Sequence, residues 1–104
     1  MAITNFQVAA NTSSAAFTAS AETAVTVIYI TNKTDGDGTV DIHVVPNGSS
    51  VSANFLVYSQ LTIKARDTYI LDTEKLILET GAKIFISAPD SAAQFNATIS
   101  TIGL

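Results

Sequence analysis

The sequence lacks most of the residues on which catalytic and metal sites depend. Its 104 residues include no cysteine and no tryptophan, and His43 is the one histidine. Without cysteine there is no disulfide framework, no thiolate metal site and no cysteine nucleophile. A Ser–His–Asp system would have to use His43 as its base, and no Gly-x-Ser-x-Gly nucleophile turn is present. We therefore expect neither enzymatic activity nor a cofactor.

Charge is also scarce. Charged residues make up 13% of the chain and the net charge is −4, whereas about 25% is usual for soluble domains. The five basic residues are spread singly, so there is no basic stripe for nucleic acid or for an anionic membrane. A surface of Ser, Thr, Asn and Gly loses little charge solvation when a neighbour covers it, which hints at assembly. A plain neutral β domain accounts for the composition equally well.

Long apolar runs are absent too. The first six residues have neither the basic region nor the apolar core of a signal peptide. The longest apolar stretch, residues 24–30, is interrupted by Thr26 and is too short to span a bilayer. We expect the protein to be made in the cytoplasm, and any role outside the cell to follow another export route or lysis.

β-Branched residues, in contrast, are abundant. Val, Ile and Thr account for 33 of the 104 residues, and these side chains favour pleated strands. Short apolar segments separated by turn residues recur about every ten residues, which is typical of a sandwich or small barrel. The prediction is an all-β chain with a single antiparallel β-sandwich, jelly-roll or immunoglobulin-like, of about seven or eight short strands.

The chain divides into two parts by composition. Residues 1–22 are rich in Ala, Ser, Thr and Asn with isolated apolar residues, and we expect them to form weak strands or an extended arm. The arm would pack on its own sandwich or, as the second choice, on a neighbouring copy. Residues 23–104 carry the regular strand patterns and are predicted to form the sandwich domain.

The first regular strand covers residues 24–31. Val25, Val27 and Tyr29 are expected on one face, and Ile28 and Ile30 on the other. Apolar residues on both faces predict a central strand, or an outer face covered by a partner. The Gly-rich turn that follows predicts an antiparallel hairpin with the next strand. In that strand, over 39–45, the expected inward residues are Val40, Ile42 and Val44.

The remaining segments are shorter. Residues 55–63 predict a strand with a kink near Ser59–Gln60, with one helical turn as the alternative. A tight corner or helical turn capped by Asp72 is expected over 72–75, and a turn over 88–91. The other expected strands cover residues 68–71, 76–78, 83–87 and 94–101.

Asp35 and Asp37 form the one local carboxylate cluster, in the sequence Asp-Gly-Asp-Gly. Alternating carboxylates on a glycine-containing loop can supply several of the oxygen ligands that Ca²⁺ requires. The bidentate glutamate of a complete calcium loop is missing, however. Asp and Gly are also common in ordinary turns, so a solvated turn is the first interpretation and a calcium site the second.

Several segments resemble small β-sandwich virion proteins of tailed bacteriophages. The resemblance lies in Thr26-Val27-Ile28-Tyr29-Ile30-Thr31-Asn32, in Val40-Asp41-Ile42-His43-Val44-Val45-Pro46, and in the order Asp67-Thr68-Tyr69, Glu74-Lys75-Leu76 and Gly81-Ala82-Lys83-Ile84. It covers residues 23–87 and leaves the first 22 unmatched. It implies a capsid decoration (cement) protein, a head fibre, or a tail or neck component, assembled in the host cytoplasm and located in the virion.

From these observations we expect a virion accessory protein, most specifically a capsid decoration protein that forms a homotrimer and binds the major capsid protein or other virion proteins. The alternative is a tail, neck or head-fibre module that binds a host-surface glycan or receptor near the turns at 33–38 and 47–50. The residues expected at protein interfaces are Phe6, Val8, Phe17, Thr26, Ile28, Ile30, Asp41, His43 and Val45.

Overall fold

The computed structural model describes residues 2–8, 13–72, 76–88 and 94–104, which form an all-β sandwich. The only helical element among them is η1 (Ala53–Phe55), a single 3-10 turn. The strands are β1 (Ala2–Val8), β2 (Ser13–Thr18), β3 (Thr23–Asn32), β4 (Gly38–Val45), β5 (Leu56–Ile63), β6 (Thr68–Leu71), β7 (Leu76–Leu78), β8 (Lys83–Ser87) and β9 (Phe95–Gly103). The predicted all-β class is confirmed.

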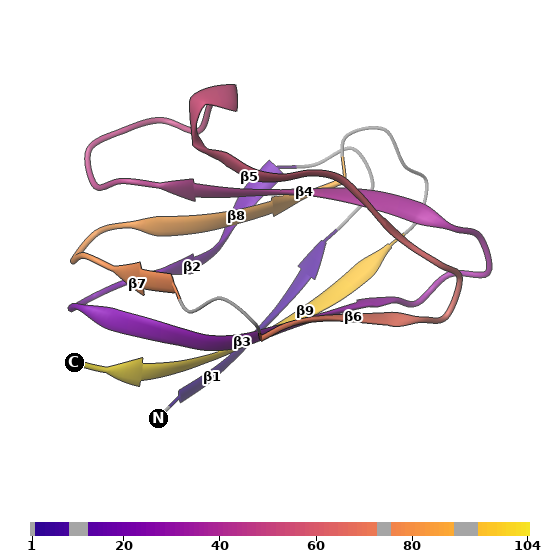
Figure 1. Cartoon of the computed structure of the whole chain (residues 1–104), viewed down its shortest axis with the longest axis horizontal. Coiled ribbons are helices and arrows are strands. Elements are labelled where there is room, and N and C mark those ends of the chain that lie inside the picture. Colours follow the sequence, from indigo (N-terminus) through magenta and orange to yellow (C-terminus); the bar gives the residue numbers. More distant parts are fainter. Residues whose placement is uncertain (1, 9–12, 73–75, 89–93) are drawn as a thin grey trace.

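Two antiparallel sheets face each other (Figure 1). One has the strand order β1-β9-β3-β6, with β7 also paired to β3, and the other has the order β2-β8-β4-β5. Apart from the short β7, eight strands are shared equally between the sheets, and β1 and β2 begin the chain on opposite sheets. This is the connectivity of a jelly roll. Within the segment 1–22, both strands therefore pair with the chain's own sheets.

The predicted hairpin between β3 and β4 is wrong, because the two strands lie in different sheets. The turn after β3 carries the chain across the sandwich. Asn32, at the end of β3, is completely buried, and its Nδ2 donates hydrogen bonds to the carbonyl oxygens of Gly36 at 2.9 Å and of Ile63 at 3.0 Å. Because Ile63 ends β5, this side chain ties one sheet to the other.

β3 is a central strand, as predicted, with β9 on one side and β6 and β7 on the other. The side chains of β3 do not all lie on the predicted faces. The pairing register with β9 shifts between Val25 and Val27 and leaves Thr26 as an extra residue. The shift places Val25 on the inner face with Ile28, and leaves Val27 facing outwards.

The core between the sheets is dominated by β-branched residues. Burying a side chain of this size stabilises the fold by about 1.5–3 kcal/mol, and alternation along each strand brings one face inwards. The largest fully buried apolar side chains are Phe95, Ile30, Ile42, Ile84, Ile86, Ile99, Val8, Val40 and Val45. Val44 packs against this core as predicted, but Val45, expected outside, is also fully buried.

β5 contains the predicted kink. Gln60 has a φ of 53°, and the pairing of β4 with β5 shifts register between Val40 and Ile42. Asp41 Oδ1 accepts a hydrogen bond from the displaced Gln60 N–H at 2.7 Å. The strand therefore continues through the irregularity, and the alternative of a helical turn is wrong. The corner expected over 72–75 and the turn expected over 88–91 lie mainly outside the described residues.

Candidate functional site

The most unusual surface of the molecule is the outer face of the sheet that contains β1, β9, β3, β6 and β7. None of these five strands contains a charged residue. We call this surface the uncharged face. The residues that point outwards on it are Ile3, Asn5, Gln7, Ala24, Val27, Tyr29, Thr31, Thr68, Ile70, Ile77, Asn96, Thr98, Ser100 and Ile102.

One part of the uncharged face is apolar. Ile77 is 70% exposed, Ile3 66%, Ile70 51%, Tyr29 41% and Ile102 40%. Tyr29 pairs directly with Ile70, while Ala24 pairs with Ile77 on one side and Ile102 on the other. Single exposed apolar residues are ordinary, but a group of them on one face marks an interaction surface.

The other part of the uncharged face is polar but neutral. Thr98 Oγ1 donates to Asn5 Oδ1 at 2.8 Å, and the hydroxyls of Thr31 and Thr68 lie 2.9 Å apart. A shallow hollow lies beside the first pair, between β1 and β9. Its lining residues are Asn5, Phe6, Gln7, Asn96, Ala97 and Thr98.

The second sheet differs, because its strands include charged residues. Asp41 lies on β4 and Lys83 begins β8. His43 is half-buried on β4, and its Nδ1 is the one buried side-chain nitrogen or oxygen of the described residues without a hydrogen-bond partner. A catalytic histidine is normally oriented by such a bond, so this geometry supplies no support for a triad.

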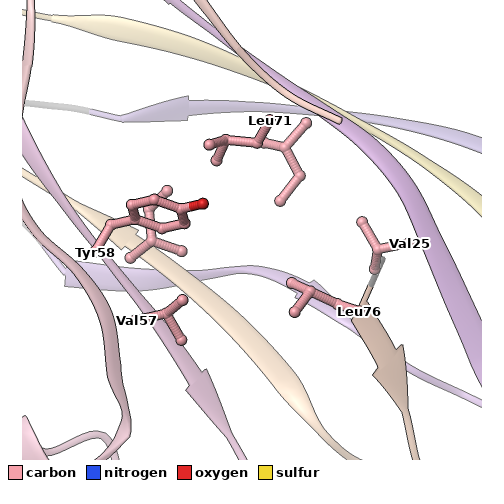
Figure 2. Close-up of a pocket in the computed structure, with 7 residues that line it drawn as sticks. Val25, Val57, Tyr58, Leu71 and Leu76 are labelled. Carbon is pink, nitrogen blue, oxygen red and sulfur yellow. The ribbon is translucent and has the colours of Figure 1, made fainter. Parts of the chain in front are cut away.

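A cavity opens between the sheets, where β5 of one sheet faces β6 and β7 of the other (Figure 2). Its volume is about 280 Å³. Tyr58 supplies the only polar side-chain group among the described lining residues, and its hydroxyl is directed into the space between Leu71 and Leu76. The lining residues are Val25, Ile28, Ile42, Val57, Tyr58, Leu71 and Leu76.

The predicted calcium ligands are engaged elsewhere. Asp35 Oδ1 forms an exposed ion pair with Arg66 Nε at 2.8 Å, and Asp37 Oδ1 accepts a hydrogen bond from the Ala65 N–H at 2.9 Å. Among the described residues, no three histidine or acidic side chains come together as a metal site. The structure therefore favours the first interpretation, a turn whose carboxylates hold it to the β5–β6 connection.

The nine residues predicted at interfaces are not brought together on one surface. Four of them have exposed fractions of 2% or less and belong to the chain's own interior, so their side chains are not available to a partner: Val8, Ile28, Ile30 and Val45. Phe6 and Phe17 are partly buried against the core. Thr26, Asp41 and His43 are also partly buried. The exposed apolar residues of the uncharged face were missed.

The chain matches no family model, no curated protein and no solved structure. Among the described residues, no helix is long and apolar enough to cross a membrane.

Proposed function

We propose that the chain is a structural accessory component of a bacteriophage virion, most specifically a capsid decoration protein that forms a homotrimer. The observation that carries the proposal is the uncharged face, with its five large apolar side chains that are 40% or more exposed. The role is binding rather than catalysis.

The charge distribution favours another copy of this chain as the occupant of the uncharged face. Each copy has a net charge of −4, so copies repel one another where acidic residues meet. The uncharged face lets two copies approach without opposing like charges and without removing charges from water. Depletion of charge at the centre of a patch is also typical of protein interfaces.

The size of the sheet is sufficient for such a contact. The Cα atoms extend over 38 × 26 × 20 Å, and the strands run along the longest of these axes (Figure 1). Four strands side by side at about 4.8 Å, with a ten-residue central strand rising about 3.3 Å per residue, give a face of about 600 Å², which is of the same order as the roughly 800 Å² that each partner contributes to a standard interface. Three copies would then multiply modest capsid contacts into strong binding.

The fold and the sequence resemblance add support of a weaker kind. Jelly rolls occur in viral capsid domains and in lectins, but a fold alone does not assign a function. The segments that resemble phage virion proteins include β3 and β4, which are central strands of the two sheets.

The test has two stages. Light scattering coupled to gel filtration at micromolar concentration should give the mass of a trimer, and a monomer would contradict the association through the uncharged face. The purified protein should then co-sediment with capsids of the phage that encodes it when those capsids lack the protein. A trimer that leaves such capsids unbound would contradict the decoration role.

A glycan-binding module is the second candidate, and the polar part of the uncharged face favours it. Amide and hydroxyl groups of Asn5, Asn96 and Thr98 line a shallow hollow, and Tyr29 pairs with Thr98 beside it. Neutral sugars are bound by such groups next to an aromatic ring. A glycan array would show selective binding that Asn96→Ala removes, and an array without hits on folded protein would exclude this candidate.

A further inference from the structure

We propose that the cavity between β5, β6 and β7 is a binding site for a small, uncharged, mainly apolar molecule with one hydrogen-bonding group, such as an aromatic alcohol. The cavity opens at the edge of the sandwich, away from the outward-facing side chains of the uncharged face. The proposal is therefore independent of the virion role, and either can fail without the other.

The cavity is built from both sheets. Its floor consists of core side chains, because Val25 and Ile28 are 2% exposed and Ile42 is 1% exposed. Leu71 and Leu76 are partly buried, pair with Ile28 and Val25 on β3, and form the wall that faces β5. A buried floor with less buried walls is the arrangement of a preformed pocket that remains open to solvent.

The volume sets the size of the ligand. An apolar cavity of about 150 Å³ holds one benzene molecule, and this cavity has about 280 Å³. It therefore has room for a fused pair of aromatic rings, which corresponds to about ten heavy atoms by comparison with benzene. An occupant would restore van der Waals contacts that the lining side chains otherwise lack.

The lining sets the chemistry of the ligand. Six of the seven described lining residues are aliphatic, and none is charged, so an ion entering the cavity would lose its hydration without gaining a partner. The hydroxyl of Tyr58 projects into the space (Figure 2) and can donate or accept one hydrogen bond. A single alcohol or carbonyl group on an otherwise apolar ligand satisfies both conditions.

Three probes separate these requirements: 2-naphthol, naphthalene and naphthalene-2-sulfonate. Titration of the whole chain, followed by amide chemical shifts in NMR spectra, should show 2-naphthol binding with a Kd on the order of 0.1 mM. Shifts should centre on β5, β6 and β7. The sulfonate should bind at least about ten times more weakly, because its charge has no partner in the cavity.

Adjacent residues provide a matched pair of variants. Leu76→Trp fills the cavity and should abolish 2-naphthol binding, whereas Ile77→Trp adds the same ring on the outer face and should leave binding unchanged. Tyr58→Phe should weaken 2-naphthol binding about five- to tenfold, the usual effect of one lost hydrogen bond. It should not change naphthalene binding.

Several outcomes would overturn the proposal. One is the absence of 2-naphthol binding to the folded wild-type chain at millimolar concentration. Another is equal binding to the Leu76→Trp and Ile77→Trp variants, which would place the probe elsewhere. If Leu76→Trp does not fold, Val57→Trp at the rim of the cavity gives the same test. Equal 2-naphthol affinity in Tyr58→Phe would remove the hydrogen-bonding requirement.

Discussion

The Nδ2 atom of Asn32 donates a hydrogen bond to the carbonyl oxygen of Ile63 at 3.0 Å, and this bond joins β3 of one sheet to β5 of the other. The same side chain accepts hydrogen bonds from the Thr34 N–H at 3.0 Å and from the Thr34 hydroxyl at 2.5 Å. The fully buried amide of Asn32 therefore bonds backbone groups of the β3–β4 connection and of β5.

Asn32→Ala should lower the free energy of unfolding by about 2–4 kcal/mol, because it removes the buried bond to the Ile63 carbonyl and three part-buried bonds to Thr34 and Gly36. Urea unfolding measures the change. Asn96→Ala is the control, since Asn96 is exposed on the neighbouring strand, and it should remain within about 0.5 kcal/mol of the wild type. A similarly small effect of Asn32→Ala would show that water replaces the amide.

Gly81→Ala should destabilise the chain by about 1 kcal/mol or more. Gly81 has a φ of 88°, and an added Cβ would lie 2.4 Å from Asn47 Oδ1. Gly48 has a similar φ of 83°, but a Cβ added there would have no atom within 4 Å. Gly48→Ala should therefore destabilise the chain less than Gly81→Ala. Equal thermal unfolding midpoints for the two variants would show that Asn47 moves aside freely.

Ile70→Lys and Tyr29→Lys should convert the proposed trimer to a monomer without unfolding it. Each places a positive charge on the uncharged face, Tyr29 on the central β3 and Ile70 on the adjacent β6, where it would have to be desolvated on association. Thr62→Lys is the matched control, because Thr62 is exposed on β5 in the other sheet. If light scattering gives a trimer for all three variants, the subunit contact lies elsewhere.

Calcium should not stabilise the chain specifically. Asp35 is paired with Arg66, and Asp37 with the backbone of Ala65, and no third acidic group joins them among the described residues. The thermal midpoint in millimolar CaCl₂ should equal that in MgCl₂ at the same ionic strength. A calcium-specific increase that Asp37→Asn abolishes would restore the calcium interpretation.

Much of the strand content was predictable because alternation of polar and apolar residues is a local property. β8 and β9 follow their predicted ranges closely, with Ile84, Ile86, Phe95 and Ile99 all buried. The kink in β5 also had a local signal, the polar pair Ser59–Gln60. These features depend on neighbours in the chain and not on which strands pair.

The sheet assignment was not predictable in this way. A Gly-rich turn after β3 is compatible with a hairpin or with a crossover, and the choice depends on the burial of Asn32 against Ile63, 31 residues away. The extra residue at Thr26 depends on pairing with β9, and it places Val25 and Val27 on opposite faces although their spacing predicts the same face.

The uncharged face was missed for the same reason. Each of its strands is visibly free of charge in the sequence, but the sequence does not say that β1, β9, β3, β6 and β7 lie in one sheet. Ile77 and Ile102, for example, lie 25 positions apart in the chain and are brought together because both pair with Ala24. The topology therefore had to be known before the surface could be recognised.

The position of β9 has a consequence for how the protein is made. Among the described strands, β9 lies between β1 and β3 and pairs with both, so β1 has no partner in its sheet until β9 has been synthesised. The sandwich cannot be completed strand by strand from the N-terminus. Contacts between such distant segments make folding slow, on the order of milliseconds to seconds, and until then the apolar strands depend on chaperones or on low concentration to avoid aggregation.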